Sequence, residues 1–453
     1  MDSLKKAFEA FANAFKIVDV RKKLLFTLSV LIIYRIGAHI TIPGVDAAVL
    51  GEYFRNSNNL FGMYDSFTGG AFAKATIFAL GIMPYISASI IIQLMGAVIP
   101  AVQMLQKEGQ EGRARLNQYT RYFTVVLAAL QGWGVSVWLS NLKVTTATGA
   151  TISVLMDDFA SGMGNIGFRL LATLTFTTGT IFVMYLGEQI TSRGVGNGIS
   201  LIIFAGIVGG LPRAFFSEVE MFYEGIQPLA IELFILALVV IIVGFIVFVE
   251  QANRRIPLQS QRRVVGTKVL GGQASYLPFK VNTAGVIPVI FASSIMFIPA
   301  MIASWMPNVN LAQTFAVAFI PGHISYSIIY ASLIIFFTFF YTAIQYNPND
   351  IADNLKKSGG FIPGIRPGKE TAKYIDHILT RISLPGALFL AVISVGPLHL
   401  KDALNMSFYI GGTSVLIVVG VALDTLRQLE AQLHTKNYEG FLKHGRIRGR
   451  MAS

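Results

Sequence analysis

The stretch FALGIMPYISASIIIQL, residues 78–94, has the composition of a membrane-spanning helix but carries two residues that oppose a regular one. It contains no charged residue, yet Gly81 and Pro84 lie in its first half. A proline inside a helix removes a backbone donor and clashes with the carbonyl four residues earlier, and in lipid the freed groups need protein or water as partners. The stretch therefore predicts a broken helix beside a cavity rather than a lipid-facing anchor.

The segment before it, LFGMYDSFTGGAFAKA from Leu60, mixes aromatic residues with glycines and with Asp65. It is too polar to span a bilayer and too apolar to lie in water. We expect it to fold back into the protein as a short re-entrant element.

The composition of the whole chain is typical of a polytopic membrane protein. Hydrophobic residues make up 53% and charged residues 13% of its 453 residues, whereas soluble domains carry about 25% charged residues. The mean hydropathy is +0.60. Because the apolar runs recur regularly, we expect one membrane domain. The chain has no cysteine, which excludes disulfides, thiolate metal sites and thiol nucleophiles.

Ten apolar runs predict membrane-spanning helices, each of which needs about 20 residues. They lie near residues 24–42, 74–95, 122–140, 168–186, 198–216, 229–249, 284–306, 324–344, 381–398 and 408–427. Of the Lys and Arg residues assigned to the connecting loops and termini, 28 lie on the side of the N-terminus and 4 on the other. Since cytoplasmic loops are enriched in positive charge, we expect both termini in the cytoplasm.

An even span count is compatible with two halves of five spans in opposite orientation, a plan that places a functional site at the midplane. We expect a cytoplasmic amphipathic helix at 1–23, an N-terminal half at 24–216, a C-terminal half at 217–427 and a basic cytoplasmic tail at 428–453. The C-terminal half contains two cytoplasmic loops, 250–283 and 345–380. This symmetry is inferred from the span count alone.

No motif indicates an enzyme. The chain contains no HExxH zinc motif, no GxSxG nucleophile elbow and no GxxxxGK[ST] phosphate loop. We therefore expect no catalytic residue, no cofactor, no metal and no small-molecule substrate. Ionisable residues inside the runs are few, namely Arg35, His39 and Glu232, and for these a structural hydrogen bond or an interfacial position is favoured over an ion pathway.

Isoleucine recurs close to glycine or proline in several runs, at Ile82, Ile86, Ile199, Ile203, Ile290 and Ile417. Taken one at a time, each is more readily explained by packing or by contact with lipid. Taken together, their stiff, branched side chains without hydrogen-bond donors predict a hydrophobic constriction. Such a ring would close around an extended chain without selecting any particular side chain.

Two cytoplasmic loops concentrate positive charge. Arg254 and Arg255 lie in the first, and the second contains KSGGFIPGIRPGKETAKYI, residues 357–375, around Arg366. The positive-inside bias explains part of this charge. The density of proline and glycine around Arg366 further predicts a shaped loop offered to a large partner. The charge suits phosphate groups or an acidic protein surface.

These stretches resemble the SecY family, whose members are the central subunits of the bacterial protein-conducting channel. The matching runs are IYRIGAHITIPGVD (33–46), FALGIMPYISASIIIQL (78–94), GNGISLIIFAGIVGGLP (196–212), NRRIP (253–257), AGVIPVIFASS (284–294), SGGFIPGIRPG (358–368) and TAKYID (371–376). The resemblance implies an all-α bundle of ten helices in the bacterial inner (plasma) membrane, with two pseudo-symmetric inverted halves around an hourglass pore. It implies that the six isoleucines named above form the ring at the waist.

The resemblance also implies a plug and a lateral gate. The plug, which closes the outer funnel in the family, corresponds to the segment 60–72, with Leu60, Phe61, Met63, Tyr64, Asp65, Phe67 and Phe72. Tyr64 and Asp65 are more polar than expected for a segment packed under the ring. A gate between the second and third spans and the seventh and eighth would release apolar segments into lipid. Its polar candidates are Ser87, Gln93, Ser293 and Ser294.

The partners implied by the resemblance are the small membrane subunits SecE and SecG, the motor ATPase SecA, the ribosome, signal peptides, preproteins and anionic lipids. Arg254, Arg255 and above all Arg366 would dock SecA or ribosomes. Since no nucleotide-binding motif is present, the energy would come from these partners or from the proton-motive force.

Two other classes of protein remain as alternatives. A secondary transporter with an inverted repeat shares the span count, but it needs coupling-ion ligands that the spans almost lack. A scaffold that only recruits partners through the basic loops would leave the broken second run unexplained.

Overall fold

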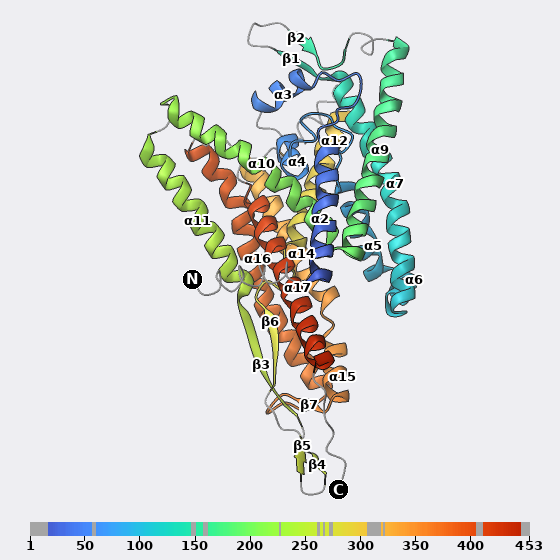
Figure 1. Cartoon of the computed structure of the whole chain (residues 1–453), viewed down its shortest axis with the longest axis vertical. Helices are drawn as coiled ribbons and strands as arrows, with labels where there is room; N and C mark the ends of the chain where they lie inside the picture. Colours follow the sequence, from blue (N-terminus) through green and yellow to red (C-terminus); the bar gives the residue numbers. More distant parts are fainter. Residues whose placement is uncertain are drawn as a thin grey trace.

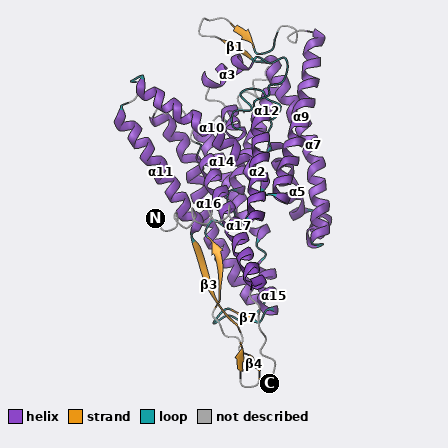
Figure 2. Ribbon diagram, in the orientation of Figure 1, coloured by secondary structure: helices purple, strands orange, loops and turns teal. Residues whose placement is uncertain are grey.

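The computed structural model describes residues 17–444, except for 57–59, 146–150, 157–161, 226–227, 261–262, 266–267, 271–274, 306–318, 320–321 and 405–410. It is a bundle of long helices with short strands at its two ends (Figures 1 and 2). The chain is therefore mostly helical, as expected, and it has short strands that the sequence did not predict. The predicted helix at 1–23 lies largely outside the described residues.

Each of the ten predicted runs overlaps one long helix. These are α2 (Val18–Gly37), α5 (Met83–Val98), α7 (Gln110–Asn141), α9 (Gly162–Arg193), α10 (Gly198–Tyr223), α11 (Leu229–Gln251), α12 (Ile287–Trp305), α14 (Ile324–Gln345), α16 (Lys369–Leu404) and α17 (Gly412–His444). Two shorter helices, α3 (Ala47–Asn56) and α4 (Leu60–Thr68), lie between α2 and α5. The last helix, α17, continues from the predicted span into the predicted tail.

Six helices within the described ranges are long and apolar enough to cross a membrane on their own. A seventh span results if α5 is joined to α6 (Pro100–Lys107), although the two are bent by 101°. The remaining three predicted runs fall short for physical reasons. The apolar parts of α10 and α12 are short, at Gly198–Pro212 and Ile287–Pro299, and α2 carries basic residues near both of its ends.

The interrupted run at 78–94 starts its helix at the proline. Helix α5 begins at Met83, with Pro84 in its first turn, where the missing N–H would have had no intrahelical partner. Residues 71–82 form non-helical turns, and Gly81 has a φ of +53°. The expectation of a helix from residue 74 that breaks at Pro84 is therefore wrong. Part of the backbone of this segment is instead paired with residues 40–42. The N–H of Ile42 donates to the carbonyl of Ala75 at 3.0 Å, and the N–H of Ile77 donates to the carbonyl of Ile40 at 2.9 Å.

Short sheets lie at both ends of the bundle. At one end β1 (Lys143–Thr145) pairs antiparallel with β2 (Thr151–Ser153). At the other end β3 (Asn253–Ser260) pairs antiparallel with β6 (Ser275–Lys280) and with β7 (Gly360–Phe361), beyond which β4 (Arg263–Val265) and β5 (Lys268–Leu270) form a hairpin. Since β3 and β7 come from the two predicted basic loops, these loops meet in one sheet.

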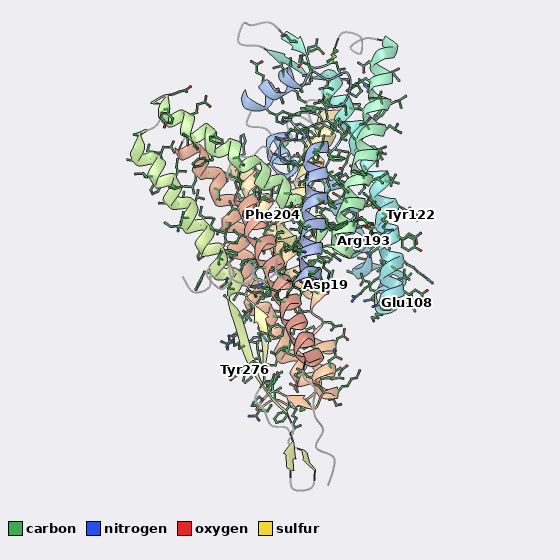
Figure 3. All side chains as sticks on the ribbon, viewed as in Figure 1. Asp19, Glu108, Tyr122, Arg193, Phe204 and Tyr276 are labelled. Carbon is green, nitrogen blue, oxygen red and sulfur yellow. The ribbon has the colours of Figure 1, made fainter. Side chains whose placement is uncertain are left out.

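The loops predicted to share a side lie at the same end of the molecule. The sheet β3–β6–β7 and α15 (Pro348–Lys357) lie at the lower end of Figure 1, and α6 lies above them at the foot of α7, whereas α3 and β1–β2 lie at the upper end. In Figure 3 the labelled Tyr276 lies toward the lower end, Glu108 lies higher up at the foot of α7, and Phe204 lies within the bundle. The large apolar core extends through the bundle, and a smaller one supports the sheet.

Candidate pore and plug

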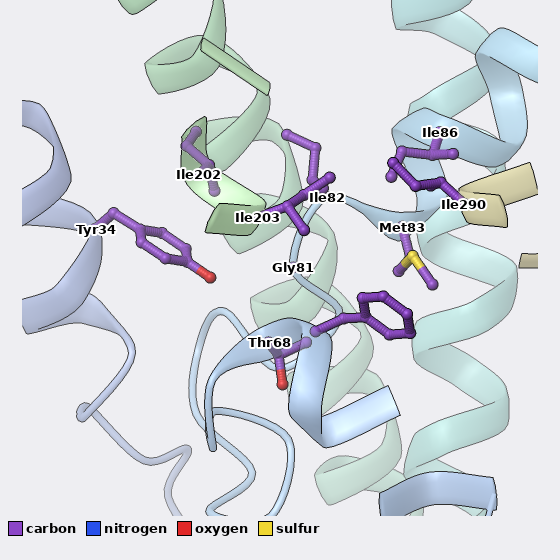
Figure 4. Close-up of a pocket in the computed structure, with 10 residues that line it drawn as sticks. Tyr34, Thr68, Gly81, Ile82, Met83, Ile86, Ile202, Ile203 and Ile290 are labelled. Carbon is purple, nitrogen blue, oxygen red and sulfur yellow. The ribbon is translucent and has the colours of Figure 1, made fainter. Parts of the chain in front are cut away.

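Helices α2, α4, α5, α10 and α12 contribute to the lining of a small cavity (Figure 4). It is lined by Tyr34, Phe67, Thr68, Gly81, Ile82, Met83, Ile86, Ile202, Ile203 and Ile290. Its volume is about 10 Å³, and a single water needs roughly 10–15 Å³. The cavity therefore has no room for a hydrated ion or a polypeptide.

Isoleucine forms most of the apolar lining of this cavity. Ile82 precedes the first residue of α5 and Ile86 lies one turn later, while Ile203 projects from α10 and Ile290 from α12. Their exposed fractions lie between 4% and 8%. The start of α5 at Met83 places Ile82 and Ile86 beside each other at the cavity. These four side chains offer water no hydrogen-bond partner.

The other two predicted ring residues lie away from the cavity lining. Ile417 is fully buried in the same core, and Ile199 packs toward Gly187 of α9, where an added Cβ would approach its Cγ1 to 3.2 Å. In their place the lining includes Ile202 and Met83. For Met83, its position directly before Pro84 is a sequence signal that could have indicated a place at the cavity. Ile202 has no sequence signal that distinguishes it from other isoleucines of α10.

Helix α4 closes one side of the cavity through Phe67 and Thr68. It is held by aromatic contacts. The rings of Tyr64 and Phe297 stack with centroids 4.3 Å apart, and those of Phe61 and Trp138 stack at 4.5 Å. Such pairs contribute roughly 0.5–1.5 kcal/mol each beyond their buried area.

The predicted segment 60–72 is only partly helical. Helix α4 ends at Thr68, and Phe72 lies in the turns that follow, where it stacks on Phe61 at 5.7 Å. The helix stops because Gly69, with a φ of +67°, turns the chain. The side chains of Leu60 and Met63 lie outside the described residues.

Both polar residues of this segment have partners. The Tyr64 hydroxyl donates to the carbonyl oxygen of Leu80 at 2.6 Å, and Asp65 Oδ1 accepts from the backbone N–H of Ala73 at 2.7 Å. Tyr64 is only 2% exposed. Since buried polar groups are tolerated when they are hydrogen-bonded, the polarity of Tyr64 and Asp65 is compatible with a tightly packed segment.

The predicted gate helices are in contact. Helix α12 packs against α5 and α7. The hydroxyl of Ser294 donates to the carbonyl of Ile290 in its own helix at 2.9 Å and lies 3.8 Å from the sulfur of Met83 in α5. Ser293 bonds within α12 and Gln93 within α5, while Ser87 is buried. The predicted polar seam therefore has one described contact between the helices, through Ser294, and its remaining contacts are mainly apolar.

The predicted docking arginines are exposed at the end of the molecule that carries the sheet. Arg254 and Arg255 lie on β3, and Arg366 lies in the loop between β7 and α16. This loop is shaped by turns, because Gly364 and Gly368 both have positive φ and Thr371 Oγ1 donates to the carbonyl of Arg366 at 2.9 Å. The sheet thus brings charges from two distant loops to one end of the molecule.

Comparisons with known proteins identify the family of this chain. The SecY family model matches residues 76–426. The chain is 47% identical to the protein translocase subunit SecY of Streptomyces scabiei, with 96% of this chain and 99% of the relative covered. It is also 47% identical to the protein translocase subunit SecY of Escherichia coli K12, with 95% and 96% covered.

The chain belongs to the SecY family. It is a bacterial multi-pass membrane protein and a subunit of a protein-conducting channel, and not an enzyme.

Solved structures share the SecY fold. One described as a protein-conducting channel has a TM-score of 0.60 at 20% identity and covers 92% of this chain and 94% of its own. A second structure has a TM-score of 0.59 at 20% identity and covers 92% of this chain and 94% of its own. It is described as showing that the SecY plug domain stabilises the closed state of the channel and maintains a membrane seal. Canine Sec61 in a ribosome–channel complex has a TM-score of 0.54 at 19% identity, again covering 92% and 94%.

Proposed function

We propose that this chain is a passive, gated conduit that passes unfolded preproteins across the bacterial inner membrane and releases hydrophobic segments sideways into the lipid. The observation that carries the proposal is the convergence of Ile82, Ile86, Ile203 and Ile290 on a cavity of about 10 Å³ that α4 closes from one side. The other two isoleucines, Ile199 and Ile417, would act by packing behind this ring.

The ring would act as a seal that fits any polypeptide. Branched apolar side chains make no hydrogen bonds with a passing chain, so passage does not depend on its sequence. At rest, the same side chains leave no wetted path for ions. The plug, with Phe61, Tyr64, Asp65, Phe67 and Phe72 as its described contacts, would seat beneath the ring and move away when a chain enters.

Lateral release would occur between α5 and α12. A segment in the pore would partition by its own transfer free energy, with each strongly apolar residue favouring lipid by about 0.3–0.6 kcal/mol and each central charge opposing it by about 2.5–3.5 kcal/mol. The weak contact between Ser294 and Met83 would let this seam open and close without breaking a strong bond. Ser87, Gln93 and Ser293 would then become available to a passing chain.

The channel would obtain its energy and its substrates from partners. The exposed Arg254, Arg255 and Arg366 suit docking of the SecA motor or of the ribosome, and a ribosome-bound relative supports the second possibility. SecE and SecG would be its small membrane subunits, signal peptides and preproteins its substrates, and anionic lipids would contact its basic surface. Both termini would lie in the cytoplasm, on the side of the basic loops.

The seal is tested by replacing two ring residues together. We expect Ile86→Ser with Ile290→Ser to wet the constriction and to raise the ion leak of resting vesicles that contain the assembled channel. The matched control is Ile32→Ser with Ile328→Ser, which changes two isoleucines with exposed fractions of 51% and 61%. A leak that stays at the control level would refute the ring.

Crosslinking separates this function from the alternatives. An arrested preprotein should crosslink to a photoreactive residue placed at Ile82 or Ile86, because both line the cavity. A secondary transporter or a recruiting scaffold would give no such crosslink, and its absence during active transport would contradict the proposal.

A further inference from the structure

The side chain of Arg35 connects three separate parts of the chain. It projects from α2, its Nη1 donates to the carbonyl of Gly69 at 3.0 Å, and its Nη2 donates to the carbonyl of Gly209 at 2.8 Å. Gly69 follows α4, and Gly209 belongs to α10. Arg35 forms no ion pair within the described part of the chain. Within the described residues, its charge is therefore stabilised by the dipoles of these two carbonyl groups.

The carbonyl of Gly69 is suited to such a bond because it lies at a helix end. The N–H of Gly70 donates to the carbonyl of Asp65 at 3.1 Å and Gly69 has a φ of +67°, which is the Schellman ending of a helix. Carbonyls at a helix C-terminus lack partners within the helix and carry partial negative charge. A guanidinium there stabilises the end of α4.

Three glycines allow these elements to approach one another. A Cβ on Gly69 would lie 2.2 Å from the carbonyl oxygen of Gly206 in α10, and a Cβ on Gly206 would lie 2.7 Å from the carbonyl oxygen of Phe67. A Cβ on Gly209 would lie 2.4 Å from the central carbon of the guanidinium. Close backbone contact between the end of α4 and α10 therefore accompanies the two hydrogen bonds of Arg35.

We propose that Arg35 is a positioning residue that latches the C-terminal end of the plug to α10 and thereby favours the closed channel. The inference rests on the proposed role of α4 as the plug. When the plug leaves, the bond to Gly69 breaks, while the bond to Gly209 still joins α2 to α10, two helices that are in contact. The charge of Arg35 then keeps a partner, so the latch can open and close reversibly.

The first test uses three variants of the assembled channel in vesicles: Arg35→Met, replacement of α4 by a glycine–serine linker, and the two changes together. The resting ion leak of each is measured. Arg35→Met should raise the resting ion leak by about tenfold, the factor that corresponds to ~1.4 kcal/mol. In the channel without α4, Arg35→Met should add nothing. An equal increase with and without α4, or no increase with α4 present, would overturn the latch. If the linker replacement by itself leaves the leak unchanged, the plug role fails instead.

The second test measures the position of the plug directly. The chain has no cysteine of its own, so Phe67→Cys introduces a single thiol at a position that is 8% exposed. Arg35→Met should speed its labelling by a maleimide that cannot cross the membrane. Arg35→Lys should give an intermediate rate, because an ammonium keeps the charge but cannot span two carbonyls as a planar fork does.

A control thiol at Ala172→Cys, a fully buried position of α9, should stay protected in every variant. If Arg35→Met exposes the thiol at position 172, that variant has lost its fold. The latch is then tested with Gly209→Ala instead. This substitution keeps Arg35 but displaces its guanidinium, so it should also speed labelling at Phe67→Cys. An unchanged rate there would overturn the proposal.

Discussion

The hydroxyl of Tyr64 is held in an apolar environment by one short hydrogen bond. It lies 2.6 Å from the carbonyl oxygen of Leu80, a residue that is fully buried. The sequence predicted a re-entrant segment at this place but not how its polarity is satisfied. The reason is that the partner is a backbone carbonyl in the irregular turns of 71–82, and no residue pattern reports where such a carbonyl points.

Tyr64→Phe tests this bond with little change in shape. The substitution keeps the ring stacked on Phe297 but leaves the Leu80 carbonyl without its partner, at a cost of roughly 1–3 kcal/mol. We expect faster maleimide labelling at Phe67→Cys and a higher resting leak. Tyr119→Phe, at a position 51% exposed, is the control and should change neither. Equal labelling in both variants would mean that the hydrogen bond does not hold the plug.

At the scale of elements, the long apolar runs located all ten long helices but misjudged where one begins. Pro84 was interpreted as a break, whereas it lies in the first turn of α5. A proline is compatible with either a break inside a helix or a position in the first turn. Which of the two occurs depends on whether the backbone of residues 71–82 finds hydrogen-bond partners outside a helix. Residues 40–42 provide such partners for Ala75 and Ile77. The strands of the basic loops were also missed, because β3 pairs with β7 across about a hundred residues of sequence.

The seam between α5 and α12 gives a prediction at the same scale. Ser294 Oγ and Met83 Sδ are 3.8 Å apart, so Met83→Cys with Ser294→Cys places two thiols across the proposed gate. A short, reducible thiol crosslinker should then block preprotein passage and membrane insertion, and reduction should restore both. The control is Met83→Cys with Ser87→Cys, one turn apart on α5, which links no two elements. Full transport in the crosslinked gate variant would contradict a gate at this seam.

At the scale of the whole molecule, charge is segregated toward one end. The net charge is +12, and the sheet β3–β6–β7 brings Arg254 and Arg255 to the end of the molecule that carries Arg366. The excess of positive charge on one side was evident from the sequence. The meeting of the two loops was not, because it depends on the pairing of β3 with β7 and on the small core that contains Ile256, Ile362 and Ile375.

Arg366→Glu tests whether this surface supplies the driving partner. Reversal of an exposed charge in a shaped loop should weaken docking of SecA or ribosomes and lower partner-driven transport by about tenfold or more, the effect of at least ~1.4 kcal/mol. The resting ion leak should not change, because Arg366 lies outside the pore-lining set. Lys356→Glu makes the same change of charge at an exposed position of α15. If Lys356→Glu lowers transport as much as Arg366→Glu, general electrostatic attraction explains the effect. A loss confined to Arg366→Glu, in a channel that remains sealed, would assign the docking contact to its loop.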